Sequence, residues 1–160
     1  MKKLLSFIAF VLLFNFSADS QVNPHAIGAR LNGSNYGFGA ELSYQHGLGD
    51  KNRLELDLGF ANHSWYSYLS VSAMYHWVWN ITGGLNWYAG PGVGASLFNG
   101  KGIYTSSFGV NIGGQIGMEY DFNTHDFPLL LSVDFRPMYN LIGHYSGFGY
   151  GSALGIRYTF

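Results

Sequence analysis

A histidine and a serine two residues apart are the residues in this sequence best suited to nucleophilic chemistry. His144 and Ser146 lie just before a predicted strand, and by the phase of that strand their shared parity points both side chains outward. An imidazole within reach of a hydroxyl can act as its general base, which is what acyl transfer requires. No Asp or Glu follows Ser146, and the nearest upstream acid, Asp134, has the parity of the other face. The pair therefore lacks an acid to orient the histidine.

Eight charged residues share one face of the predicted strands, and that face also carries most of the small residues. Glu41 and Asp57 are expected to be neighbours on adjacent strands, since both lie at similar distances from the turn at 47–52. Two like charges there require an arginine between them or a proton on one of them. We therefore expect a paired network, with a proton or ion path as the alternative. The set is Arg30, Glu41, Glu55, Asp57, Glu119, Asp134, Arg136 and Arg157, with a net charge of −2 if all are ionised.

Other chemistry has less support in the sequence. The six histidines are scattered without the spacing of metal ligands, so no metal site is predicted. The absence of cysteine excludes disulfides and thiolate chemistry. The glycine-rich segment 90–94 is not followed by a helix pattern, so it cannot form a phosphate-binding loop. The near-zero net charge gives no reason to expect nucleic acid, and no cofactor is predicted.

The elements that must position these residues are strands. Apolar and polar residues alternate with a period of two in eight segments joined by short turns, which predicts an antiparallel meander. Pro91 lacks an amide hydrogen, so we expect a bulge or a local break in pairing there. An even number of strands places both ends of the domain on one side. The expected strands are 25–32, 36–46, 53–61, 66–79, 85–97, 106–120, 129–139 and 147–160.

The first twenty residues have the pattern of a cleaved secretory signal. Lys2 and Lys3 precede the short apolar run 4–16, and Ala18 and Ser20 are small residues at the positions that precede a cleavage site. The run is too short to span a membrane comfortably. We therefore expect a signal peptide at 1–20 and a single domain at 21–160.

The positions of the charges predict which strand face is inside. The apolar face carries no charge, and the six charged residues of 21–160 outside the shared set, Arg53 among them, fall in or beside predicted turns. The other face is mostly Gly, Ser and Asn, which suits the crowded interior of an eight-stranded barrel. This pattern favours a transmembrane barrel over a soluble one. Two aromatic girdles are expected: Trp77, Trp79, Trp87, Tyr120 and Tyr158 on the turn side, and Tyr36, Tyr139 and Tyr150 on the loop side.

The last fourteen residues, GFGYGSALGIRYTF, resemble the closing strand of bacterial outer-membrane β-barrels, which ends on an aromatic residue after alternating apolar positions. The pattern of the whole domain is similar to small barrels of the OmpA/OmpX type. This resemblance implies the outer membrane of a Gram-negative bacterium, contact with lipid and lipopolysaccharide, and a monomer. It also implies that Phe160 and Tyr158 are recognised by the barrel assembly machinery.

The segment around Ser146 is similar to the His-x-Ser of the outer-membrane lipid A deacylase family, in which the serine is the nucleophile and the histidine its base. That family also uses a downstream Glu, which this chain lacks. We therefore expect an integral outer-membrane barrel with a plugged polar lumen and a structural, interaction or stress-related role. The alternatives are a lipid A acyl hydrolase using Ser146 and His144, and a soluble barrel that binds a small apolar ligand.

Overall fold

Eight antiparallel strands make up nearly all of the structure. The computed structural model describes residues 22–34, 37–62, 64, 66–101, 106–143 and 147–160. The eight predicted strands are confirmed, and no strand end differs from its expected position by more than three residues. The elements are β1 (His25–Ser34), β2 (Gly37–Gly47), β3 (Asn52–Asn62), β4 (Tyr66–Thr82), β5 (Leu85–Gly100), β6 (Ser107–Asp121), the 3-10 turn η1 (Phe122–His125), β7 (Leu129–Ile142) and β8 (Gly147–Thr159).

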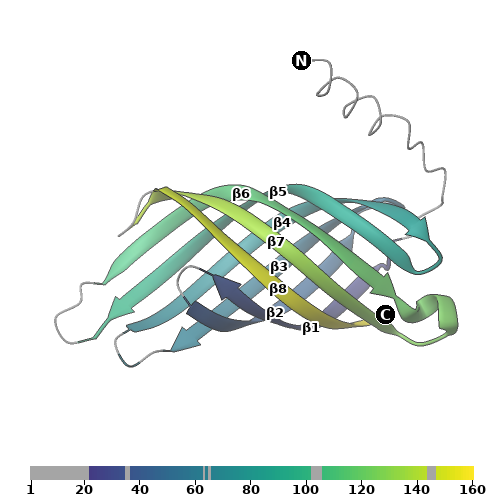
Figure 1. Ribbon diagram of the computed structural model, residues 1–160, viewed down its shortest axis with the longest axis horizontal. Coiled ribbons are helices and arrows are strands. Elements are labelled where there is room, and N and C mark those ends of the chain that lie inside the picture. The colour runs from purple at the N-terminus through teal and green to yellow at the C-terminus, as the bar shows by residue number, and fades with distance from the viewer. Residues whose placement is uncertain (1–21, 35–36, 63, 65, 102–105, 144–146) are drawn as a thin grey trace, which may run out of the picture.

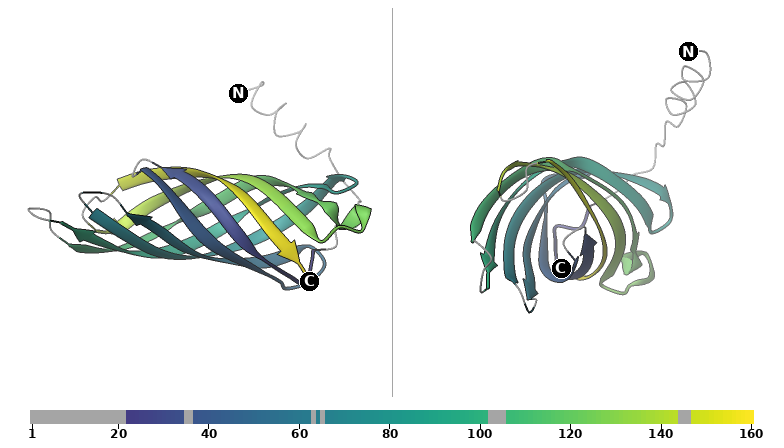
Figure 2. Two further views of the ribbon diagram at one scale, coloured as in Figure 1. Left: turned by 90° about the horizontal axis from the view of Figure 1, so that it is seen from below. Right: turned by 60° about the vertical axis from the view of Figure 1, so that its left-hand side comes forward.

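The sheet closes into a barrel, as the sequence predicted. Each strand pairs with the next, and β1 pairs with β8 without interruption from Ala26 opposite Thr159 to Ser34 opposite Gly151. Closure pairs the backbone groups that an open sheet edge would leave exposed, and lipid cannot hydrate such groups. The strands run obliquely along the barrel (Figure 1) and enclose its interior when the barrel is viewed closer to its axis (Figure 2).

The two ends of the barrel differ in their connections. One end carries the links after β2, β4 and β6 and the end of β8, and we call it the turn end (Figure 1). The opposite end, where β1, β3, β5 and β7 finish, is the loop end. The predicted signal peptide at 1–20 lies outside the described residues. In the part of the chain that the structure describes, no helix is long and apolar enough to cross a membrane.

Two prolines lie at interruptions in the strand pairing. The register of β4 with β5 is the same on both sides of Pro91, while the pairing skips residues 75 and 76. Of the two outcomes expected at Pro91, the structure has the local break rather than the bulge. Pro137 lies at a similar gap between β6 and β7. Neither proline can donate to the ladder, so pairing is lost there without moving the strands.

The outer face of the barrel is apolar. Leucine, isoleucine, valine and phenylalanine side chains point outward from every strand, and the charges of the shared set point inward. Leu31, Leu154 and Ile156, for example, are more than half exposed. A soluble barrel keeps its apolar residues inside, so the soluble ligand-binding alternative does not fit this arrangement.

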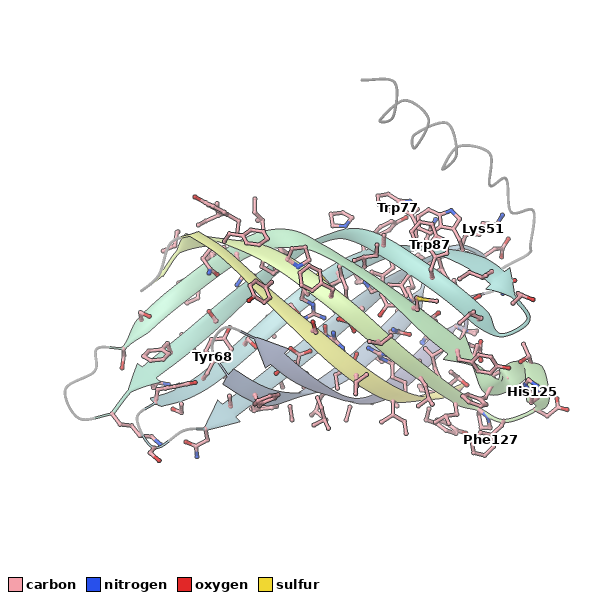
Figure 3. All side chains as sticks on the ribbon, in the orientation of Figure 1. Lys51, Tyr68, Trp77, Trp87, His125 and Phe127 are labelled. Carbon is pink, nitrogen blue, oxygen red and sulfur yellow. The ribbon has the colours of Figure 1, made fainter. Side chains whose placement is uncertain are left out.

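Aromatic side chains gather on the outer face near both ends. Trp77 and Trp87 project outward near the turn end (Figure 3), and the Trp87 ring stacks on Trp79 at 4.3 Å between centroids. Tyr139 and Tyr150 are exposed near the loop end. The predicted girdle position Tyr36 lies outside the described residues. Such belts place amphipathic rings at the level of lipid headgroups.

Candidate functional site

The interior of the barrel holds the largest concentration of polar chemistry in the described residues. All eight predicted charges lie there, and each except Arg136 is less than a tenth exposed. Seven of them form one connected network of ion pairs and hydrogen bonds. The eighth, Glu119, belongs to a second cluster closer to the turn end. The two clusters contain residues from all eight strands.

Arg30 connects three carboxylates. Its Nη1 donates to Glu41 Oε2 at 2.5 Å and to Asp57 Oδ2 at 3.0 Å, and its Nη2 donates to Asp134 Oδ1 at 2.6 Å. Glu41 and Asp57 are therefore bridged by an arginine, which is one of the two arrangements expected from the sequence. A guanidinium carries five N–H donors in a rigid plane, and this makes such multiple pairing possible. Arg30 is only 1% exposed, so its charge depends on these partners rather than on water.

Glu55 accepts hydrogen bonds from several strands and is fully buried. Its Oε2 accepts from Arg157 Nη2 at 2.9 Å and from Gln45 Nε2 at 2.6 Å. Its Oε1 accepts from Gln115 Nε2 at 3.2 Å and from Arg136 Nη2 at 3.3 Å. Four donors surround the two oxygens, which is the condition under which a buried carboxylate is tolerated.

Arg136 caps the network on its loop side. Its Nη2 donates to Asp57 Oδ2 at 2.6 Å and its Nη1 to Ser72 Oγ at 3.1 Å. The side chain is 12% exposed, which makes it the most accessible arginine of the network. Above it a cavity of about 150 Å³ reaches toward the loop end, with both asparagine and aromatic side chains in its lining, among them Asn32, Asn111 and Tyr68. The network is therefore the floor of this cavity, which we call the vestibule.

Sequence reasoning missed the centre of the second cluster. Arg53 was placed beside a turn, but it lies inside the barrel, 2% exposed, and forms a two-pronged pair with Glu119: Nη1 to Oε1 at 2.8 Å and Nη2 to Oε2 at 2.6 Å. Its Cζ also lies 4.7 Å from the centre of the Tyr88 ring. The signal that could have found it is parity, because Arg53 alternates in phase with Glu55 and Asp57.

Arg53 is a fourth arginine in the interior, and Asp121 at the turn end of β6 is a sixth buried carboxylate, so the net charge of these described groups is −2 if all are ionised. His76 lies in the same cluster, accepting from Arg53 Nε at 3.3 Å and packing on Tyr88 at 4.6 Å between ring centres. The Tyr88 hydroxyl in turn lies 3.5 Å from Asp134 and connects the two clusters.

Glycine allows these large side chains to fit. Tyr88 lies opposite Gly117 in the pairing of β5 and β6. A Cβ atom on residue 117 would lie 2.5 Å from the Tyr88 Cζ, so the ring occupies the space a side chain would need. The interior is therefore filled by a few large polar and aromatic groups packed over glycine, as expected for a barrel of this size.

Hydrogen bonds at the turn end extend across the opening of the barrel. Asp121 accepts from Asn23 Nδ2 at 2.7 Å and from Asn123 Nδ2 at 2.6 Å, and Asn123 Nδ2 also donates to Thr159 Oγ1 at 2.8 Å. Asp121 also caps η1 by accepting from the Asn123 amide at 2.9 Å. These bonds hold the segment before β1, the turn η1 and the end of β8 together.

His144 and Ser146 lie outside the described residues. Asp134, the nearest upstream acid, is buried in the interior and bonded to Arg30 and Tyr88. Among the described residues no group of three or more His, Cys, Asp or Glu side chains is arranged to hold a metal ion.

Comparison with known proteins identifies the fold class. No protein-family profile and no curated protein matches the sequence. Neisserial surface protein A aligns with a TM-score of 0.63 and 16% identity over 85% of this chain and 95% of its own. The N-terminal β-barrel domain of Pseudomonas aeruginosa OprF gives 0.57 and 17%, covering 86% and 100%. Ail, the attachment invasion locus protein of Yersinia pestis, gives 0.54 and 14%, covering 85% and 96%.

At these identities the likeness establishes the fold. The protein has the architecture of the small eight-stranded outer-membrane β-barrels, and the resemblance inferred from its sequence pattern is confirmed at that level. The likeness does not define the role of this chain, which depends on its own residues.

Proposed function

We propose that this protein is an integral barrel of the bacterial outer membrane, with a structural or interaction role and no open channel. The observation that carries the proposal is the interior network, in which Arg30 and Arg157 join strands that are far apart in sequence across the lumen. An apolar outer face and aromatic belts at both ends suit a bilayer. Outer-membrane lipid and lipopolysaccharide are the expected surroundings, and we propose a monomer.

Two barriers at different depths of the barrel support a non-conducting lumen. The ion-paired network fills the middle of the barrel, and the bonds among Asn23, Asp121 and Asn123 cross its turn end. Ions passing through would have to break pairs that are buried and short, and a buried pair that loses one partner is strongly destabilised. The vestibule then ends at the network and does not continue toward the turn end.

The conductance of the purified barrel tests this proposal. Protein refolded in detergent and inserted into planar bilayers should give no steady single-channel conductance at neutral pH, while a porin in the same bilayers provides the positive control. Faster gel mobility before boiling than after boiling verifies that the inserted material is folded. A reproducible conductance from the wild-type protein would show that the interior is open and would overturn the plugged lumen.

Membrane location is tested separately. After cell fractionation, the protein should appear in the outer-membrane fraction and resist extraction by carbonate or urea, because its outer face requires lipid. Recovery as a soluble periplasmic protein would contradict the proposal whatever the conductance.

The absence of catalysis is also testable. The lipid A spectra of cells producing the wild-type protein, the Ser146→Ala variant or neither should be identical in mass. Loss of an acyl chain only with the wild-type protein would establish the hydrolase alternative instead.

A further inference from the structure

Two histidines far apart in the sequence are neighbours on the outer face at the turn end. His25 begins β1 and His46 lies near the end of β2, and the two are direct partners in the register of the β1–β2 hairpin. Their Nδ1 atoms are 3.3 Å apart, and their rings stack at 5.0 Å between centroids. The two histidines are 21 positions apart in the sequence, so linear ligand spacing did not reveal the pair.

The separation of the two nitrogens matches a metal chelate. Zinc binds imidazole nitrogen at about 2.0–2.1 Å in tetrahedral geometry, so two such ligands lie about 3.3–3.4 Å apart. Without a metal, two facing lone pairs at this distance repel, and one Nδ1 must carry the hydrogen. A metal ion that accepts both lone pairs satisfies the pair without that hydrogen.

Neighbouring groups hold the pair in place and leave it accessible. The amide of His25 donates to Phe160 O at 3.1 Å, and the Phe160 amide donates back to His25 O at 3.0 Å. The Tyr44 hydroxyl forms a hydrogen bond with His25 Nδ1 at 2.9 Å, so a metal ion bound to this nitrogen would replace that bond. His46 is exposed and His25 half-buried, so an ion can approach from the aqueous side of the rim.

We propose that His25 and His46 form a surface site for one divalent transition-metal ion of the class that prefers imidazole, such as Zn²⁺, Ni²⁺ or Cu²⁺. Water completes the coordination, and the Tyr44 hydroxyl lies next to it. The bound ion joins β1 to β2 beside the seam with β8. The site is independent of the interior network and of the conductance of the barrel.

Zinc binding to the folded barrel tests the site. Tag-free protein in detergent, titrated with Zn²⁺ in a buffer that does not chelate, should bind one ion per barrel. Linking two ligands raises affinity by about 10²–10⁴-fold over either alone, so His25→Gln or His46→Gln should weaken binding by about 100-fold or more. His125→Gln is the matched control, since His125 is an exposed turn-end histidine that contacts Thr124 rather than another histidine.

A second measurement identifies the ligands directly. Cu²⁺ bound to the wild-type barrel should give an electron paramagnetic resonance spectrum with two coupled nitrogens, and His46→Gln should remove the two-nitrogen signal. Gel mobility of unboiled samples establishes that each variant is folded. Absence of saturable one-to-one binding by the folded wild type would overturn the proposal, as would equal zinc affinity of His46→Gln and His125→Gln or equal binding of Mg²⁺.

Discussion

The Arg30 guanidinium on β1 lies 2.6 Å from the Asp134 carboxylate on β7, although they are 104 positions apart in the sequence and β8 lies between their strands. The bond therefore spans the closing seam of the barrel from inside. Backbone pairing joins β1 to β8 and β8 to β7, and this side-chain contact joins the outer two of these three strands directly. Closure of the sheet and pairing of the interior charges are thus linked through one arginine.

The first prediction concerns this arginine. Arg30→Met leaves Glu41, Asp57 and Asp134 without their common partner in a buried site, and breaking a buried pair in this way costs about 3–5 kcal/mol of unfolding free energy. Urea unfolding of the barrel in lipid vesicles measures the loss. Lys51→Met, a change at an exposed turn residue, should stay within about 0.5 kcal/mol of wild type. Equal unfolding midpoints for Arg30→Met and Lys51→Met would show that the network is hydrated and contributes little.

The second prediction concerns the two-pronged pair of Arg53 and Glu119. Either Arg53→Met or Glu119→Leu alone leaves one buried charge without its main partner and should cost about 3–5 kcal/mol. The double variant removes both charges, so it should be closer to wild type than either single variant is. A double-mutant cycle in detergent-refolded protein measures this coupling. If the free-energy losses of the two single variants add up to that of the double variant, Arg53 and Glu119 do not stabilise the barrel through their mutual pairing.

The strands and their facing could be predicted from the sequence because a barrel in lipid requires strict alternation. Leu54, Leu56 and Leu58 point outward and Glu55 and Asp57 inward, and no other arrangement keeps the charges out of the bilayer. The proximity of Glu41 and Asp57 also followed from their positions around one turn, and the arginine that bridges them is one of the two arrangements expected there. Parity and turn position were sufficient for these predictions.

What could not be predicted depends on register and on three-dimensional distance. Arg53 was counted with the turn because it is the first residue of the expected strand, although in the structure the strand already begins at Asn52. The proximity of His25 and His46 depends on the hairpin register, and that of Arg30 and Asp134 depends on the tilt of the strands around a closed barrel. The two-residue period of a strand gives neither the register between strands nor the distances between side chains, so the partners in each ion pair had to come from the structure.

The third prediction concerns the lipid-facing surface. Leu56, Val71 and Ile112 are exposed on the outer face, so cysteines placed there should react with a lipid-soluble maleimide and resist a charged aqueous one in intact proteoliposomes. Leu56→Arg should lower the unfolding free energy by about 2–4 kcal/mol if this position lies near the midplane of the bilayer. Leu48→Arg, in the β2–β3 turn, serves as the control and should be tolerated. Ready aqueous labelling at all three cysteine positions would contradict a transmembrane barrel.

The fourth prediction tests whether Phe160 acts as an assembly signal. Its ring is 59% exposed on the outer face and stacks near His25, and we propose that it is recognised together with Tyr158 during insertion. Phe160→Asp should reduce the amount of protein in the outer membrane and leave periplasmic degradation products, while Phe160→Tyr should assemble normally. Immunoblots of fractionated cells make the measurement. Normal membrane levels of Phe160→Asp would refute the proposed role.

The last prediction concerns the packing of Tyr88 over Gly117. Gly117→Ala places a Cβ atom 2.5 Å from the Tyr88 Cζ and 2.7 Å from the Val133 carbonyl oxygen, so the ring or the strand must move. Overpacking of this kind costs about 1–3 kcal/mol, and thermal unfolding in detergent should detect it. Gly49→Ala, where an added Cβ meets nothing within 4 Å, should leave the melting temperature unchanged.

A second variant distinguishes the contribution of the Tyr88 ring to this loss of stability from that of the strand backbone. In a Tyr88→Ala background the ring is gone and only the Val133 carbonyl still opposes the new methyl group, so adding Gly117→Ala should then lower stability by less than it does in wild type. The difference between the two losses measures the contact itself. An identical loss in both backgrounds would mean that strand backbone, rather than Tyr88, requires glycine at position 117.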